Sequence, residues 1–201
     1  MNIQELLQWR YATKVFDTEK QVSEEDLTSL LQEANLSATS YGLQPFEFVV
    51  VNNQEIKNAL LEHSFGQKHV TENSHLIVLA VRTDIDENYV TEYIERIEQE
   101  RELPKGSIDD FKNMMISALV NLPQAEKIVW AQKQAYIALG TLMIAVSAKK
   151  IDGCPMEGFD SEAYDKILGL TEKNLHATVI FPIGYRSDSD ETQHYVKVRK
   201  A

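Results

Sequence analysis

The chain has 201 residues, and its 20 Lys and Arg against 31 Asp and Glu give a formal net charge of −11. This acidic balance excludes a general nucleic-acid-binding surface, because phosphate contacts need a basic face, although one small basic pocket remains compatible with it. Hydrophobic residues make up 43% and charged residues 25%, which is typical of a globular chain rather than a disordered one. The length predicts a single domain over residues 1–201.

Three absences narrow the class further. No apolar run approaches the roughly 20 residues that a membrane span needs, so we expect no membrane contact. The start, Met1-Asn2-Ile3-Gln4-Glu5, lacks the basic and apolar parts of a secretory signal. The one cysteine, Cys154, excludes an intrachain disulfide and a multi-cysteine metal site, and we interpret it as a small core residue. The sequence therefore predicts an acidic cytoplasmic protein.

The first half of the chain alternates between predicted helices and short strands. Apolar residues at helical spacing predict a helix over residues 1–9, and a second helix follows the capping box of Ser23 and Asp26. Short apolar runs predict buried strands over Phe46–Val51 and Leu76–Val81. A further helix is expected between these strands, from Asn53 to about His63.

Helices dominate the second half. We expect an acidic helix over Asp86–Glu102 and another over Ile108–Leu119, separated by a break at Pro104–Gly106. The longest helix, from about Pro123 to Lys149, carries so many apolar residues that we predict it to be buried nearly all round. The remaining elements are a helix over Ser161–Leu168, a strand over Ala177–Pro182 and a terminal strand over Tyr195–Arg199. Few strands among many helices predict an α+β fold, with helices wrapped around a small sheet.

Several catalytic patterns are missing from the sequence. No Gly-rich phosphate loop follows a strand, and no Gly-x-Ser-x-Gly elbow is present. The five histidines, at positions 63, 69, 75, 176 and 194, show no metal-ligand spacing, so we predict no metal site. If the protein is an enzyme, a bound cofactor is expected to carry the reaction.

Four separated segments carry the chemistry that the sequence offers. They are Arg10–Asp17, with two cations and a hydroxyl; the hydroxyl-rich loop Ser37–Phe46; Pro155–Phe159, after the long helix; and Lys197–Arg199, whose two cations would share one face of a strand. Each segment alone also reads as ordinary: a solvated turn, a polar loop, or a turn between helices.

In this order, the four segments resemble the nitroreductase family of flavoproteins, specifically the branch of oxygen-insensitive NAD(P)H nitroreductases and dihydropteridine reductases. The resemblance runs from Arg10 to Arg199, and its most specific parts are Gln44-Pro45 before an aromatic residue and Pro-x-Glu-Gly-Phe after the long helix. It implies a three-layer fold with a mostly antiparallel sheet, FMN bound without covalent attachment, and a homodimer with two interface flavins. It also implies a C-terminal strand exchanged with the partner subunit, and a ping-pong cycle in which NAD(P)H reduces FMN before a small planar acceptor binds.

The resemblance gives both ends of the chain a role in binding the cofactor. Arg10 and Arg199 are expected at the FMN phosphate, joined by Lys197, because Arg presents a fork of donors to phosphate oxygens. Lys14 matches the family's cation near flavin N1 and the C2 carbonyl, and it is a catalytic candidate for that reason. Tyr11, Ala12 and Thr13 complete this segment; Ala12 stands where relatives often have serine, and Thr13 is expected to use its backbone.

The segment after the long helix matches the family's contact to the reactive edge of the flavin. Glu157 and Gly158 are catalytic candidates because their backbone N–H groups would point at flavin N5 and O4, with Gly158 allowing a close approach. Pro155 and Met156 are expected to pack against the flavin ring.

Other cofactor contacts are expected from two loops. Thr39, Ser40 and Gly42 match a loop that the family brings from the second subunit, where relatives often carry asparagine in place of Gly42. Gln67 is expected near the ribityl chain or the pyrimidine edge. His69 falls near a cationic position used toward the nicotinamide nucleotide, with an ordinary surface histidine as the alternative.

The identity of the acceptor and the efficiency of turnover are left open. The resemblance places the substrate-facing surface within residues 89–122, and ordinary helix packing is the alternative; the apolar residues concerned are Tyr93, Phe111, Met114, Met115 and Ile116. Nitroaromatics, quinones and pteridines are the expected acceptors. The alternative function is a flavin-binding protein with little turnover, or a divergent member acting on flavin itself or on a halogenated ring. Much of the negative charge is expected away from the site, in residues 84–102 and 188–191.

Overall fold

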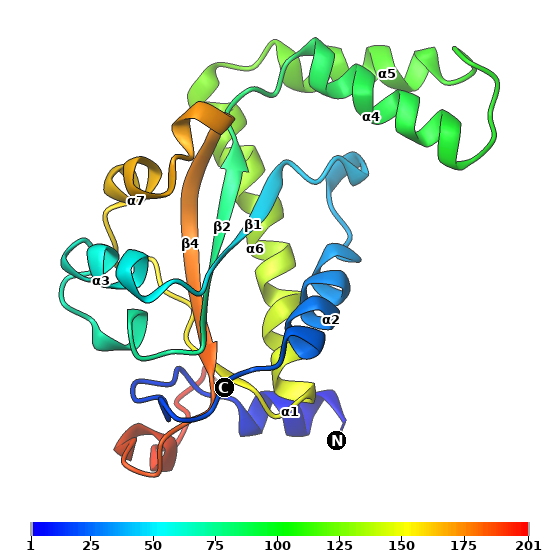
Figure 1. Ribbon diagram of the computed structural model, residues 1–201. Coiled ribbons are helices and arrows are strands. Elements are labelled where there is room, and N and C mark those ends of the chain that lie inside the picture. Colours follow the sequence, from blue (N-terminus) through cyan, green and yellow to red (C-terminus); the bar gives the residue numbers. More distant parts are fainter. Residues whose placement is uncertain (1, 201) are drawn as a thin grey trace.

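The computed structural model describes residues 2–200, where seven α-helices surround one four-stranded antiparallel sheet (Figure 1). The strands lie in the order β1-β2-β4-β3 and are β1 (Phe46–Val51), β2 (His75–Arg82), β3 (Asp152–Gly153) and β4 (Leu175–Gly184). The helices are α1 (Ile3–Trp9), α2 (Glu24–Asn35), α3 (Gln54–Glu62), α4 (Glu87–Glu100), α5 (Asp109–Met115), α6 (Gln124–Ala148) and α7 (Ser161–Leu168). The expected α+β class and the antiparallel sheet are confirmed.

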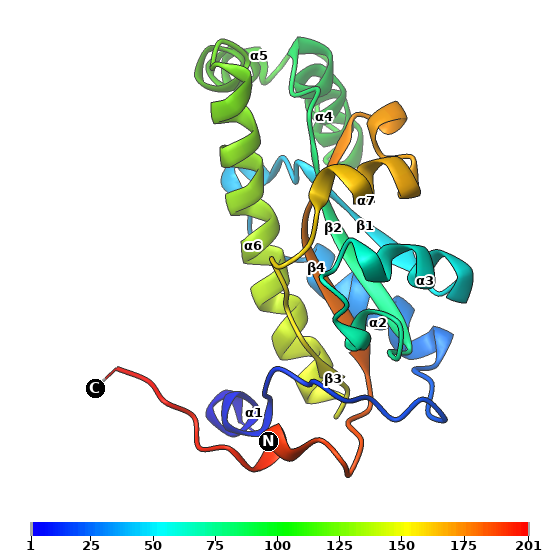
Figure 2. The same cartoon turned by 90° about the vertical axis from the view of Figure 1, so that its left-hand side faces the viewer.

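The sheet forms the middle of three layers. On β2, alternate side chains point to opposite faces, so Ile77, Leu79 and Val81 join one apolar core while Leu76, Val78 and Ala80 join another. The first core is closed by α6 and α2, and the second by α3 and α7. Figure 2 shows α6 on one side of the sheet and α3 with α7 on the other. Because both of its faces are covered, β2 is a continuous apolar run in the sequence.

Helix α6 is not buried all round within this chain, so that prediction is wrong for the structure described. Its inner face packs Ala131, Ala135 and Leu142 against the core, but Val129 and Ile137 are each 48% exposed. The reason is geometric: a single sheet covers only one side of a helix, and within residues 2–200 no other element covers the opposite side along its length. An apolar helix face is thereby left in contact with solvent.

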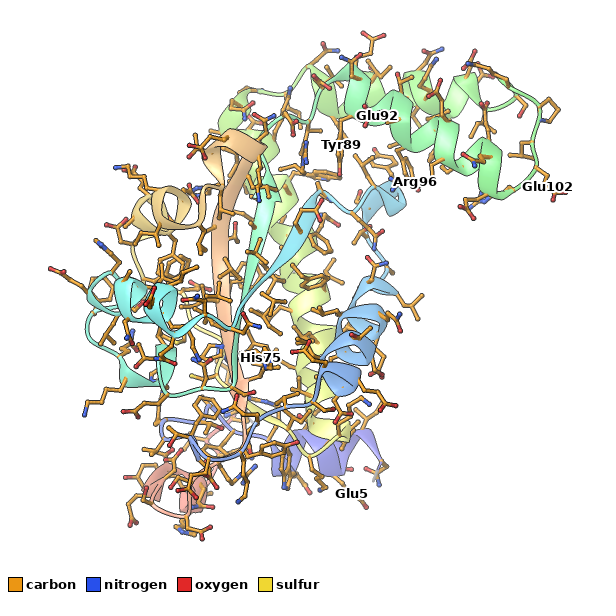
Figure 3. All side chains as sticks on the ribbon, in the orientation of Figure 1. Glu5, His75, Tyr89, Glu92, Arg96 and Glu102 are labelled. Atoms are coloured by element: carbon orange, nitrogen blue, oxygen red, sulfur yellow. The ribbon has the colours of Figure 1, made fainter. Side chains whose placement is uncertain are left out.

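Helices α4 and α5 project from the body as an arm beyond the end of the sheet (Figure 1). The hydroxyl of Tyr93 donates to the carbonyl of Tyr41 at 2.8 Å, which ties the arm to the loop before β1. Figure 3 places Tyr89 and Arg96 on the side of α4 that faces this loop. After α5 the chain continues through one π-helical turn, Ile116–Val120, into the start of α6.

The C-terminal segment runs beside α1 in extended form (Figure 2). It follows a 3-10 helix, Glu191–His194, and residues 195–200 form no strand within the described chain. The strand expected over Tyr195–Arg199 therefore has no partner inside one subunit, and its exchange with a second subunit remains a proposal. Within residues 2–200, no helix is long and apolar enough to cross a membrane.

Candidate functional site

The N-terminal segment after α1 lies along the short strand β3. Ala12 pairs in parallel with Gly153, and Phe16 forms a bridge with Arg186. Within this segment Thr13 and Phe16 are buried, while Ala12 and Lys14 are exposed. Thr13 is fully buried, and its backbone N–H donates to the carbonyl of Gly153 at 3.5 Å.

Asp190 anchors this segment, and sequence reasoning missed it. Its buried carboxylate accepts from the backbone N–H of Lys14 at 2.8 Å, from that of Val15 at 3.1 Å, and from the hydroxyl of Tyr11 at 2.9 Å. Burial alone would raise its pKa, but hydrogen bonds from Thr192 and from these amides lower the pKa of Asp190 to about 2. The expectation that residues 188–191 lie away from the site is wrong, because this carboxylate fixes the backbone that carries Lys14.

Three cations gather beside α1, and we call them the cation cluster: Arg10, Lys197 and Arg199. They line one hollow of about 640 Å³ together with Ile3 and Leu7. Lys197 donates to the carbonyl of Gln8, and among the described residues none of the three cations makes an ion pair with a carboxylate. Burial, followed by the charge of Arg199, lowers the pKa of Arg10. Uncompensated cations held this close together favour an anionic ligand.

Lys14 stands next to neutral groups. Its Nζ lies 3.4 Å from the Sγ of Cys154, a thiol that is 1% exposed and whose pKa is raised by burial. Burial, and then the charge of Lys14, lowers the pKa of His69 to about 4, so this imidazole is neutral at pH 7. His69 is 6% exposed, so the alternative of an ordinary surface histidine is wrong. The Lys14 ammonium is thus left without a counter-ion in the described chain.

Residues 155–158 form a segment that we call the strap, which runs beside Cys154. Backbone hydrogen bonds between Met156 and Ile180 of β4 hold the strap against the sheet. The amide N–H groups of Glu157 and Gly158 donate to no acceptor within residues 2–200, so both are available to a ligand. The side chain of Met156 is buried in the apolar core that α3 and α7 close, and its packing against a flavin ring remains a prediction. Pro155 is half-buried at the start of the strap.

Two side chains hold the strap from either side. Gln67 donates through Nε2 to the carbonyl of Gly158 at 2.9 Å and to that of Ser64 at 3.0 Å. Both hydrogens of its amide are therefore used within the protein, and only its oxygen remains for the cofactor contact expected of Gln67. The hydroxyl of Tyr136, on α6, donates to Oε1 of Glu157 at 2.7 Å. Sequence reasoning missed Tyr136, because its place in an apolar helix gave no signal of a polar contact.

The structure does not bring Thr39, Ser40 and Gly42 to the cations within one chain. Their loop, in light blue in Figure 1, lies below α4 at the upper end of the sheet, whereas α1 lies at the lower end. The backbone N–H of Ser40 donates to Gln134 Oε1 at 2.8 Å, and the hydroxyl of Thr39 accepts from the backbone N–H of Gln44 at 3.3 Å. Within one chain these groups therefore bind the loop to α6 and to its own backbone.

Gly42 has a physical reason to lack a side chain. Its φ is +73°, and a Cβ built on it would lie 2.5 Å from the hydroxyl oxygen of Tyr93. Any side chain at this position would therefore displace the hydroxyl that ties the arm to the loop.

The arm presents part of the apolar surface expected to face the substrate. Phe111 is half-buried, with its ring 6.3 Å from that of Tyr41, and Met114 is exposed. Met115 is fully buried, so including it in this surface was wrong. Helical periodicity accounts for the difference, because these two adjacent methionines point to different sides of α5.

No metal centre is visible in the described part of the chain. Among residues 2–200, no three His, Cys, Asp or Glu side chains are grouped so as to hold a metal ion.

Comparisons with known proteins agree with this geometry. Residues 7–185 match the model of the nitroreductase family. The chain is 35% identical over 188 residues to a protein of Staphylococcus haemolyticus named a "putative NAD(P)H nitroreductase", covering 90% of this chain and 86% of that protein. It is also 35% identical over 189 residues to YfkO of Bacillus subtilis, which has the same descriptive name, covering 89% of this chain and 86% of YfkO.

Solved structures show the same fold. The crystal structure of the nitroreductase-like YdfN of Bacillus subtilis has a TM-score of 0.88 at 23% identity, covering 98% of this chain and 94% of that one. A nitroreductase-like protein of Exiguobacterium sibiricum, solved in complex with FMN, has a TM-score of 0.85 at 21% identity, covering 100% of this chain and 94% of that one. On the extent of the family match and the identity to these relatives, the chain belongs to the nitroreductase family.

Proposed function

We propose that this protein is an FMN-dependent NAD(P)H oxidoreductase that reduces nitroaromatics, quinones or pteridines. The observation that carries the proposal is a row of three unsatisfied polar features on one side of the subunit. These are the cation cluster, the Lys14 ammonium beside Cys154, and the two free amides of the strap. Each matches a different part of FMN.

The cation cluster fits the phosphate end. Arg10 and Arg199 supply guanidinium forks and Lys197 a point charge, and no carboxylate of the described chain competes for them. Burial and then the charge of Arg199 lower the pKa of Arg10, and a bound phosphate dianion would oppose both effects.

Lys14 and the strap fit the ring. When bound, FMN supplies hydride chemistry, accepting from NAD(P)H and passing on to the acceptor in a ping-pong order. Lys14 would stabilise negative charge at the pyrimidine edge, because neither Cys154 nor His69 supplies a counter-charge to its ammonium group. The amides of Glu157 and Gly158 orient toward the reacting edge, and Tyr136 with Gln67 keeps them in place.

The proposal includes a homodimer with two cofactor sites. Apolar side chains on α1 and α6 are exposed in the single chain, including Ile3, Leu7, Val129 and Ile137. The loop with Thr39, Ser40 and Gly42 lies at the other end of the sheet from the cation cluster, so only a second copy can supply it to that cluster (Figure 1). In this arrangement the extended segment after His194 contacts the partner, while Lys197 and Arg199 stay beside Arg10 of their own subunit. A monomer in sedimentation at micromolar concentration, still holding flavin, contradicts the arrangement.

An anaerobic titration tests the function. The purified protein is expected to show oxidised-flavin absorption near one FMN per chain, to lose it on addition of NADH or NADPH, and to regain it on addition of a nitroarene or a quinone. Loss without recovery would support the alternative of a flavin-binding protein with little turnover. Absence of bleaching by either nucleotide refutes the oxidoreductase proposal, and absence of flavin refutes the cofactor assignment.

A further inference from the structure

A second hollow lies at the lower end of β2, and none of the residues described above as site residues lines it. Its volume is about 390 Å³, and it lies between the starts of α2 and α3 and the turn before β2. His75, labelled in Figure 3, lies at this end of the strand. Four polar side chains in its wall, Lys57, Asn73, Ser74 and His75, are only 3–4% exposed. A wall with this many buried polar groups is unusual for a surface depression without a ligand.

Lys57 is a buried cation without a counter-ion. Its Nζ donates to the carbonyl of Asn73 at 2.8 Å, and within residues 2–200 it has no other hydrogen-bond partner and no carboxylate within 4 Å. An ammonium has three N–H groups, so two of them remain for a ligand. Burial lowers the pKa of Lys57, which shows that the protein around it does not compensate for its charge.

His75 supplies a second donor. The hydroxyl of Ser74 accepts from the Val22 amide at 2.8 Å and lies 2.9 Å from Nδ1 of His75. We assign the Ser74 hydroxyl as the donor and Nδ1 of His75 as the acceptor. The hydrogen of the neutral imidazole then lies on Nε2. This Nε2 lies 3.7 Å from Glu24, too far for a hydrogen bond, and the Glu24 side chain is 80% exposed. Burial lowers the pKa of His75, the charge of Glu24 raises it and the charge of Lys57 lowers it. His75, Glu24 and Lys57 are therefore close enough to interact electrostatically.

We propose that this hollow binds a small oxyanion, a carboxylate or a phosphate, between the Lys57 ammonium and the Nε2–H of His75. The anion supplies the missing counter-charge in a place where burial strengthens the attraction. Glu24 and Glu72 at the rim oppose it, so the site selects small anions of low charge. Removing the charge of Glu24 should therefore tighten binding.

Thermal unfolding and isothermal titration calorimetry on the purified protein test the proposal, with sodium acetate and sodium phosphate as probes at constant ionic strength. We expect a saturable rise of Tm with at least one anion, and the two arms identify whether a carboxylate or a phosphate fits. Lys57→Met should weaken binding at least tenfold, whereas Lys68→Met, at an exposed lysine nearby in sequence, should not. Without anion, Lys57→Met should be at least as stable as the wild-type protein, because methionine fills the same space without a buried charge.

Phosphate can also bind the cation cluster, so Arg199→Ala serves as a second control: the response that depends on Lys57 should survive it. Absence of a saturable response in the wild-type protein, or an equal response in Lys57→Met, overturns the proposal. If Lys57→Met does not fold, Glu24→Gln decides the question. Tighter binding in Glu24→Gln supports the site, and unchanged binding overturns it.

Discussion

Acidification from pH 7 to pH 5 is expected to destabilise the protein through His69. This imidazole is 6% exposed, and burial followed by the charge of Lys14 lowers its pKa from 6.5 to about 4. The unfolded chain takes up a proton as the pH falls through 6.5, and the folded protein does not until about pH 4. The contribution of neutral His69 to the free energy of unfolding is therefore fully present above pH 6.5 and is lost as the pH falls from 6.5 to about 4. Linkage gives a loss of about 2 kcal/mol between pH 7 and pH 5, rising to about 3 kcal/mol below pH 4.

Urea unfolding followed by tryptophan fluorescence at both pH values measures this loss, at one protein concentration because association also contributes to stability. His69→Gln should lose about 2 kcal/mol less than the wild-type protein on acidification. Some pH dependence should remain, since burial also lowers the pKa of His75. His194→Gln, at an exposed histidine, is the control and should behave as wild type. An equal loss in His69→Gln and wild type refutes the reasoning.

The other predictions concern the proposed cofactor site and the loop before β1. Arg199→Ala should raise the dissociation constant of FMN about tenfold or more in a fluorescence titration, because a charge-assisted phosphate contact contributes about 1.5–3 kcal/mol; an unchanged constant argues against the assignment. Lys14→Ala should lower the midpoint potential of bound flavin and slow its reduction, with an unchanged circular dichroism spectrum. Tyr136→Phe should speed hydrogen exchange of the Met156 amide, the strap amide that donates to Ile180, because Glu157 loses its donor at 2.7 Å and the strap is held less firmly; exchange at the wild-type rate would show that the contact does not hold the strap. Gly42→Ala should destabilise the protein by about 1–3 kcal/mol in urea unfolding, and more than Gly66→Ala, which has a similar φ of +69° but no neighbouring atom within 4 Å of an added Cβ.

The regular elements could be predicted where the pattern was long. The apolar run of β2 and the capping box before α2 gave elements close to those observed, and Ser23 does accept from the amide of Asp26. Strand β3 could not be predicted, because its two residues, Asp152 and Gly153, carry no periodicity and join the sheet through β4, far along the chain. The exposed face of α6 was mistaken for a buried one, since periodicity records apolar residues and not what covers them.

The candidate site divides in the same way. The gathering of Arg10 with Lys197 and Arg199 was predicted from the family resemblance and is observed within one subunit. The tertiary contacts were not predictable: Asp190 lies in a polar stretch that is typical of a solvated loop, and three of its donors come from residues 175 or more positions away. A sequence motif also does not say which of its side chains are buried: Met156 is buried in the core, and the adjacent Glu157 is exposed.

The joining of the two chain ends at the cation cluster also sets an order of events during synthesis. Arg10 is made before every strand of the sheet, whereas Asp190, which fixes the backbone of Lys14, and the two other cations of the cluster are made after β4. A growing chain on the ribosome can form the sheet once β4 has emerged, but the cation cluster, the proposed phosphate site, is incomplete until Lys197 and Arg199 have been added. Retention of the proposed cofactor would thus report on chains that extend through Arg199, and fragments that end soon after β4, which still contain the sheet, would be distinguished from them by their lack of flavin colour.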